Sequence, residues 1–113
     1  MTSGGSIPTY DELASYISNA FASLRMPYME WANLARRAIQ GQPYDARQLA
    51  ALEHFINERR AELRTVIIIA SEHLDELQLV SLRNQASMSK YAWKSLKRRE
   101  QVNLKDGFRL IIY

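Results

Sequence analysis

The 113-residue chain contains no cysteine. This absence excludes a disulfide framework and any metal site held by thiolates, and it favours a reducing compartment. The longest apolar run, Val66 to Ala70, has five residues, whereas a membrane-spanning helix needs about 20. The N-terminal MTSGGSIP lacks the charged and apolar regions of a secretory signal. We therefore expect a soluble intracellular protein, located in the cytoplasm or with the nucleoid or nucleus.

Glycine and proline are also scarce, with four and three copies. From Tyr44 to Asp106, 63 consecutive residues contain neither, and strong helix formers such as alanine, leucine, glutamate and arginine are frequent there. We predict an all-α fold, a four- to five-helix bundle with one long central helix and a short extended or hairpin C-terminal end. Residues 1–8 are expected to form a flexible N-terminal arm, and residues 9–113 a single helical domain.

Local signals predict the boundaries of the first helices. Thr9 and Glu12 have the spacing of a capping box, in which each side chain satisfies a free backbone N–H at a helix start. Pro27 predicts the junction between the first and second helices, because proline is tolerated in the first turn of a helix. Gly41 is suited to cap the end of the second helix. Asp45 is the expected N-cap of the third.

The third helix is predicted to be long. After Asp45 the apolar positions keep a spacing of three or four residues, and no stop signal occurs before residues 81–89. An unbroken helix to Gln85 would be about 60 Å long, whereas a globule of this size has a radius of gyration of roughly 13 Å. The helix must therefore break, with Ser71 as the favoured position, or project toward a partner chain.

The run VIII over 66–69 bears on that choice. Adjacent β-branched residues favour a strand, but the charged residues on both sides keep a helical pattern, so we predict a helix that is buried on all sides. Its extra apolar side is expected to contact the first two helices or a second copy of the chain, which makes a homo-oligomer plausible. The residues assigned to this oligomer interface are Leu63, Val66, Ile67 and Ile69.

Lysine is confined to the last quarter of the chain, at Lys90, Lys94, Lys97 and Lys105. Residues 1–85 hold eight arginines against ten acidic residues, whereas residues 86–113 hold seven cations against two acidic residues. The net charge of +3 is therefore divided into −2 and +5. Such an asymmetry predicts an anionic partner.

The segment SKYAWKSLKRRE, residues 89–100, predicts a basic helix capped by Ser87 or Ser89. One face would hold Met88, Tyr91, Ala92, Ser95 and Leu96, and the opposite face Lys90, Lys94, Lys97, Arg98 and Gln101, with Trp93 at the border. Cations one turn apart can follow phosphates, and an adjacent aromatic ring can stack on a base. We therefore assign binding of DNA or RNA to Lys90, Trp93, Lys94, Lys97, Arg98 and Lys105. The competing interpretation is a solvated face, with Trp93 completing the core.

Three alternatives remain open. One is a helix-turn-helix, with helices over 74–83 and 88–100, joined by residues 84–87 and followed by a wing over 102–112. Another is a protein–protein interaction module, such as an adaptor, inhibitor or assembly subunit, that acts through the long apolar helix and the Tyr113 end. A basic helix lying on an anionic membrane is a weaker alternative, because serine, glutamine and arginine interrupt its apolar side.

No catalytic or cofactor motif is present, so we expect that the chain is not an enzyme and has no cofactor or small-molecule substrate. His54 precedes Glu58 by one turn, and His73 lies near Glu72 and Glu76, but neither Glu-x-x-His nor His-x-x-x-His occurs. No metal site and no catalytic residue is therefore assigned. The serines lie outside nucleophile-elbow contexts, and the glycines are too few for a phosphate-binding loop.

Overall fold

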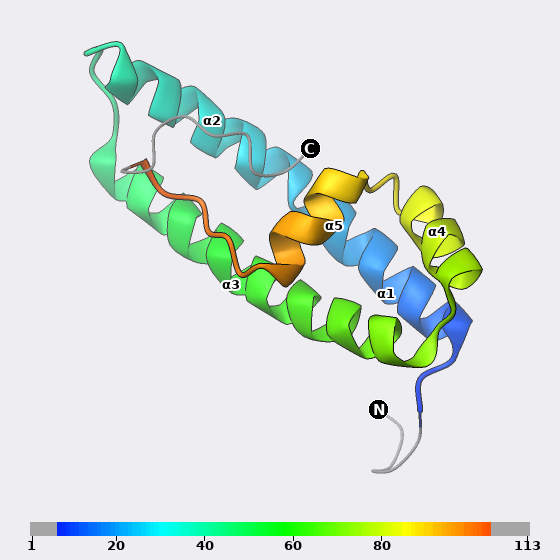
Figure 1. The fold of residues 1–113 in the computed structure, drawn as a ribbon. Coiled ribbons are helices and arrows are strands. Elements are labelled where there is room, and N and C mark those ends of the chain that lie inside the picture. Colours follow the sequence, from blue (N-terminus) through cyan, green and yellow to red (C-terminus); the bar gives the residue numbers. More distant parts are fainter. Residues whose placement is uncertain (1–6, 105–113) are drawn as a thin grey trace.

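The computed structural model describes residues 7–104, and regular structure in this range is helical (Figure 1). The helices in chain order are α1 (Tyr10–Ser23), α2 (Arg25–Ile39), α3 (Ala46–His73), α4 (Glu76–Gln85) and α5 (Lys90–Lys97). No strand occurs among the described residues. The predicted all-α fold with one long central helix is confirmed.

The starts of α1 and α3 follow the sequence signals. Thr9 Oγ1 accepts a hydrogen bond from the Glu12 N–H at 3.2 Å, and Glu12 Oε1 accepts one from the Thr9 N–H at 2.9 Å. Asp45 Oδ1 accepts from the N–H groups of Arg47 and Gln48 at 3.0 and 3.1 Å. These side chains satisfy N–H groups that have no partner within the helix. Both predicted N-caps are confirmed.

The junction between α1 and α2 lies at Leu24, slightly before the predicted position at Pro27. Proline lacks an N–H, and its ring clashes with the carbonyl four residues earlier, here that of Ser23. The interruption therefore falls one turn before the proline. Gly41 caps the end of α2 as predicted, with φ at 73°, and the next N–H donates to the Arg37 carbonyl at 2.8 Å. Glycine adopts this left-handed conformation without a steric penalty.

The long central helix α3 has 28 residues, which corresponds to a length of about 42 Å. It ends at His73. Leu74 is extended, and Asp75 begins α4 by accepting the Gln78 N–H at 2.8 Å. The predicted break near Ser71 is confirmed to within a few residues. The molecule is more elongated than the expected globule, with a longest axis of 49 Å and a radius of gyration of 15.7 Å.

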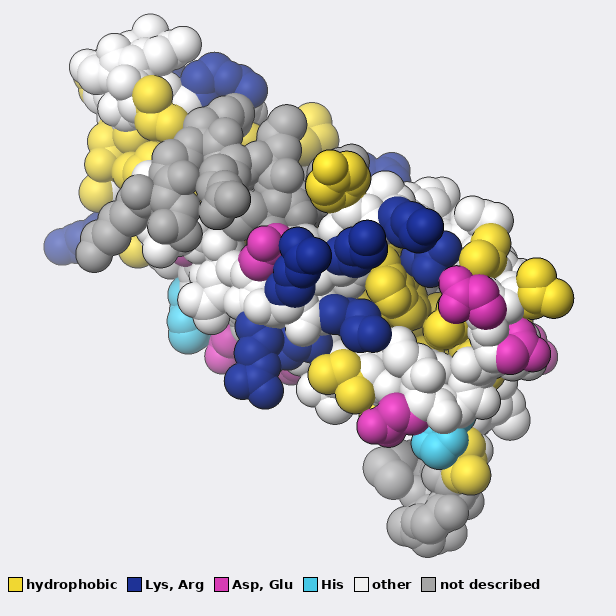
Figure 2. Space-filling model, viewed as in Figure 1, with side chains coloured by type: hydrophobic (Ala, Val, Ile, Leu, Met, Phe, Trp, Pro, Cys, Tyr) yellow, Lys and Arg dark blue, Asp and Glu magenta, His cyan; other side chains and the backbone are white. Residues whose placement is uncertain are grey.

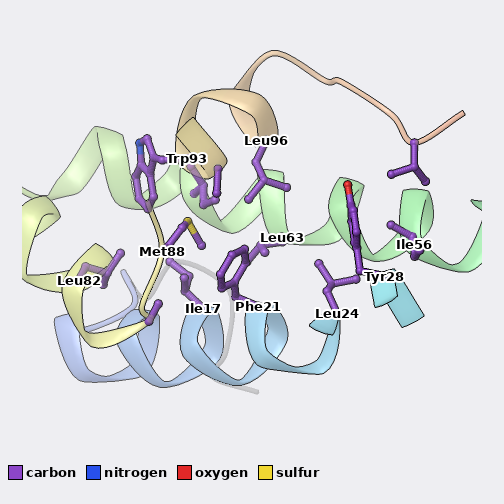
Figure 3. Close-up of a cluster of buried hydrophobic side chains, with 14 of the residues drawn as sticks. Ile17, Phe21, Leu24, Tyr28, Ile56, Leu63, Leu82, Met88, Trp93 and Leu96 are labelled. Atoms are coloured by element: carbon purple, nitrogen blue, oxygen red, sulfur yellow. The ribbon is translucent and has the colours of Figure 1, made fainter. Parts of the chain in front are cut away.

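The helices surround one core. α1 and α2 follow one another along α3 and run antiparallel to it, α4 packs on α1, and α5 packs on α3 (Figure 1). Side chains from α1, α3, α4 and α5 point toward one another between these helices (Figure 3). The largest fully buried side chains are Trp31, Ile17, Leu24, Ile56, Leu63, Ile67, Leu82, Leu96 and Val102.

Two of the four residues assigned to an oligomer interface belong instead to this core. Leu63 and Ile67 are fully buried within the chain, because α1 and α5 pack on α3, so neither is exposed to a second copy in this structure. Val66 and Ile69 are half-buried and pack against the same core. Ile68 is 39% exposed. The run over 66–69 is therefore helical as predicted, but it is not buried on all sides.

Several predictions concern residues 1–6 and 105–113, which lie outside the described residues. They include most of the N-terminal arm over 1–8, the cation Lys105, the Tyr113 end and most of the hairpin or wing over 102–112. Of that last segment, residues 102–104 are described and are not part of a strand.

Candidate nucleic-acid interface

The basic segment forms α5, a helix of eight residues. Ser89, one of the two predicted caps, accepts the Ala92 N–H on Oγ at 3.1 Å. Isolated helices of this length are unstable in water, so α5 depends on packing against the rest of the chain. It buries Ala92, Trp93, Ser95 and Leu96, and Leu96 faces Leu63 of α3 (Figure 3).

A buried arginine of α3 holds the end of α5. Arg60 is 3% exposed, and it donates from Nε to the Glu100 carbonyl at 3.0 Å and from Nη2 to Ser95 Oγ at 2.7 Å. Burial lowers the pKa of Arg60, while Tyr28 and Glu100 oppose that change. A guanidinium stays protonated in proteins. α5 therefore ends over a permanent positive charge that is bound by a hydroxyl and a backbone carbonyl.

Two further side chains of α3 fix the segment that follows α5. Asn57 donates from Nδ2 to the Val102 carbonyl at 3.0 Å and accepts the Val102 N–H on Oδ1 at 2.8 Å. Glu53 Oε2 accepts both the Leu104 N–H and the Trp31 indole N–H at 2.9 Å. Arg60, Asn57 and Glu53 thus bind three successive points of this segment, which runs back along α3 (Figure 1). The position of α5 is fixed on both sides of its C-terminal turn.

The opposite side of α5 carries the predicted cations. Lys90, Lys94, Lys97 and Arg98 are exposed; we call these four residues the α5 cationic face. Figure 2 shows Lys and Arg side chains gathered over α5. Within residues 7–104, none of the four makes an ion pair within 4.0 Å, the described pairs being His54 with Glu58 and Arg59 with Glu62. The cations are therefore brought together as predicted, and no acidic residue of the described chain neutralises them by direct contact.

Trp93 does not belong to this face. It is 6% exposed, and the Arg83 guanidinium of α4 lies 5.8 Å from its ring centroid. A ring that is covered by the core and by an arginine cannot stack on a base. The structure thus places Trp93 in the core, as in the competing interpretation, and its cation–π contact with Arg83 joins α4 to α5.

The exposed aromatic residue of α5 is Tyr91, which the sequence pattern places on the buried face. Its side chain is 84% exposed. Successive residues of a helix are rotated by about 100°, so Tyr91 and Trp93 flank Ala92 at equal angles on opposite sides. The sequence pattern therefore could not distinguish them. The Arg83 contact lies on the Trp93 side, and this leaves Tyr91 in solvent beside the cations.

Helix stability explains some of the cations but not all. Lys94 and Lys97 lie in the last turn of α5, where the helix dipole favours positive charge. Lys90 is the first residue of α5, and the first turn contains no acidic residue. A cation at that position opposes the dipole. Lys90 therefore needs an explanation other than the stability of its own helix.

The helix-turn-helix hypothesis requires the two helices to pack on each other. In the structure α4 packs on α1, whereas α5 packs on α3. The joining residues contain Ser87 with φ at 54°, a left-handed conformation in which glycine is usual. The helix order of this hypothesis is present, and the Arg83–Trp93 contact joins the two helices, but each helix packs mainly on another one, α4 on α1 and α5 on α3.

Within residues 7–104, no three metal-ligating side chains are close enough to hold a metal ion. In that range, no helix has the length and apolar character that crossing a membrane requires. Comparison of the chain with protein-family models, with curated proteins and with solved structures gave no match.

Proposed function

We propose that the chain is a non-enzymatic nucleic-acid-binding protein and that the α5 cationic face is its contact surface. One observation supports this most directly. Lys90, Lys94, Lys97 and Arg98 share the exposed side of one helix, and within residues 7–104 no acidic group pairs with them. Unpaired, clustered cations release counterions when they bind a polyanion, and this release favours association.

The spacing of the lysines suits a phosphate backbone. Lys90 and Lys97 are about 10 Å apart along the helix axis, which matches roughly three nucleotide steps of one strand. Lysine is a mobile point charge that contacts phosphate without selecting a sequence. The proposed binding is therefore independent of base sequence.

A charge-neutralised variant tests this function. Replacing Lys90, Lys94 and Lys97 by glutamine lowers the net charge from +3 to zero. The matched control replaces the exposed Arg25, Arg37 and Arg47 by glutamine, which removes the same charge elsewhere. Binding to a fluorescein-labelled strand of roughly 16 nucleotides is measured by anisotropy. We expect the lysine variant to lose at least tenfold in affinity and the control to lose much less, as estimated from lost phosphate contacts.

Salt dependence gives a second measurement. With four phosphate contacts, the logarithm of the binding constant should fall against the logarithm of salt concentration with a slope of about −3 for a single strand. The lysine variant should show a slope nearer to zero. Equal affinities and equal slopes for the two triple variants would contradict the proposal, because binding would then follow net charge rather than α5.

A protein-interaction module is the second candidate function, and a different surface favours it. On α4, Leu77 is 81% exposed and Val80 37% exposed, so this short helix presents an apolar strip to solvent. Under this alternative, sedimentation velocity should detect a self-association that Leu77→Gln abolishes and that high salt does not weaken. A concentration-independent monomer would remove self-association from consideration.

A further inference from the structure

Tyr91 differs from two aromatic residues that are held by contacts within the fold, Trp93 of α5 and Tyr10 of α1. Trp93 is buried beneath Arg83, and Tyr10 of α1 donates its hydroxyl to Ser81 at 2.9 Å. Tyr91 is 84% exposed, and within residues 7–104 no hydrogen bond or ring contact holds it. A large amphipathic ring in this position adds nothing to the packing of the core. The ring is therefore free to contact a ligand.

The surroundings of Tyr91 indicate the kind of ligand. Lys94 is three residues further along the helix and Arg98 seven, so both lie on the same side as the ring. Lys90 is adjacent in sequence, and α5 contains no acidic residue. Cations that follow a phosphate backbone, together with an aromatic ring that stacks on bases, are the two components of single-strand binding surfaces.

We infer that the ligand is single-stranded nucleic acid and that Tyr91 stacks on one of its bases; this inference rests on the proposed function. In a duplex the base faces are covered by neighbouring bases, so an exposed ring reaches them only by unstacking a step. A single strand offers its base faces freely. The α5 cationic face alone would hold both forms, and Tyr91 adds a contact that only the single strand makes.

α5 is also poorly suited to read a duplex groove. Its eight residues span about 12 Å, and one side is occupied by contacts with α3. Arg60 and Asn57 fix its end close to the surface of α3. A helix held in this way presents one face to solvent and does not project as a recognition helix must. Contact with a strand lying over the surface fits this geometry better.

The test compares two substitutions of Tyr91 on two forms of the ligand. Tyr91→Phe keeps the ring, and Tyr91→Ser removes it; Tyr44→Ser, at a half-exposed tyrosine outside α5, is the matched control. Each protein is titrated into labelled oligo-dT, oligo-U and a duplex of equal length. Loss of one stacked base should weaken single-strand binding about tenfold. We expect this loss for Tyr91→Ser only, and little change for the duplex.

The outcomes separate this inference from the proposed function. If Tyr91→Ser binds single strands as the unsubstituted protein does, or if the duplex binds equally well, the inference is overturned while the proposed function stands. If the triple lysine variant binds all ligands normally, the proposed function fails and the inference fails with it. A preference for single strands that depends on the ring, with oligo-dT or with oligo-U, supports the inference.

Discussion

Exposed cations on α3 and on α5 have different surroundings. On α3, Arg59 pairs with Glu62 at 2.7 Å, and its guanidinium also lies 5.1 Å from the ring centroid of Phe55. The Glu62 carboxylate raises the pKa of Arg59 through this hydrogen bond. On α5, Lys90 and its neighbours have no acidic partner within residues 7–104. Arg59 is thus compensated by a neighbour on its own helix, whereas the α5 cationic face has no such acidic neighbour within residues 7–104.

The two regions also differ in how their helices end. α2 ends at a glycine, Gly41, in the left-handed conformation. The turn before α5 contains Ser87 with φ at 54°, and Arg99 follows α5 with φ at 62°. Neither residue is a glycine, so both adopt the left-handed conformation at a steric cost. Such positions cost about 1 kcal/mol or more for a residue with a side chain. The position of α5 is thus maintained by tertiary contacts against a local cost.

The largest expected loss of stability comes from the substitution that removes the attachment of α5 to α3. Arg60→Ala should lower the free energy of unfolding by about 3 kcal/mol, because it creates a cavity and removes the donors bound to Ser95 and Glu100. Arg59→Ala, one residue earlier on the exposed side, should have a much smaller effect, because an exposed ion pair contributes little to stability. Urea unfolding measures both. Equal effects would contradict the assignment of Arg60 as the anchor of α5.

A smaller effect is expected from the segment after α5. Asn57→Ala removes both hydrogen bonds to Val102 and should cost about 2 kcal/mol. Asn33 of α2 is exposed and bonds only to Arg36 in the described contacts, so Asn33→Ala should be nearly neutral. Amide hydrogen exchange at Val102 should accelerate in the first variant and not in the second. Unchanged protection at Val102 would show that the segment is held by other means.

Relieving the strained backbone conformation of Ser87, in the turn before α5, should stabilise the protein. Ser87→Gly is expected to raise the free energy of unfolding by about 0.5 to 1 kcal/mol, because glycine tolerates positive φ. The preceding residue, Ala86, has φ at −83°, so Ala86→Gly should destabilise by a comparable amount. Thermal unfolding of the two variants compares them. A lower melting temperature for Ser87→Gly would be inconsistent with local strain at this turn.

The smallest expected change in stability comes from charge reversal on α5. For Lys90→Glu, stability and nucleic-acid binding should change in opposite directions. Lys90→Glu should stabilise α5 by about 0.5 kcal/mol, because an acidic residue suits the first turn, whereas Lys94→Glu in the last turn should destabilise it by a similar amount. Both variants should bind nucleic acid more weakly. Chemical unfolding and anisotropy together measure this opposition. If Lys90→Glu bound as tightly as the unsubstituted protein, Lys90 would have no part in the contact surface.

Much of the fold could be predicted because its signals are local. The bonds of Thr9 to Glu12 and of Asp45 to Gln48 span three residues, so short sequence patterns contain all the partners. The cationic face of α5 was predictable for the same reason, since helical periodicity alone places Lys90, Lys94 and Lys97 together. Arg60 lies four residues after Ile56 and three before Leu63, so helical spacing alone places it on the buried side of α3. Its role as an anchor was not predictable, because its partners Ser95 and Glu100 lie 35 and 40 residues further along the chain.

The sequence by itself determined the helical class, the main helix boundaries and the separation of lysine from the rest of the chain. Only the tertiary structure decided that Trp93 is buried and Tyr91 exposed, and that α3 holds the end of α5. The physical reason is distance along the chain. The bonds of Arg60 to Ser95 and of Asn57 to Val102 join residues 35 and 45 positions apart. Periodicity within one helix does not show which other helix will pack against each of its sides.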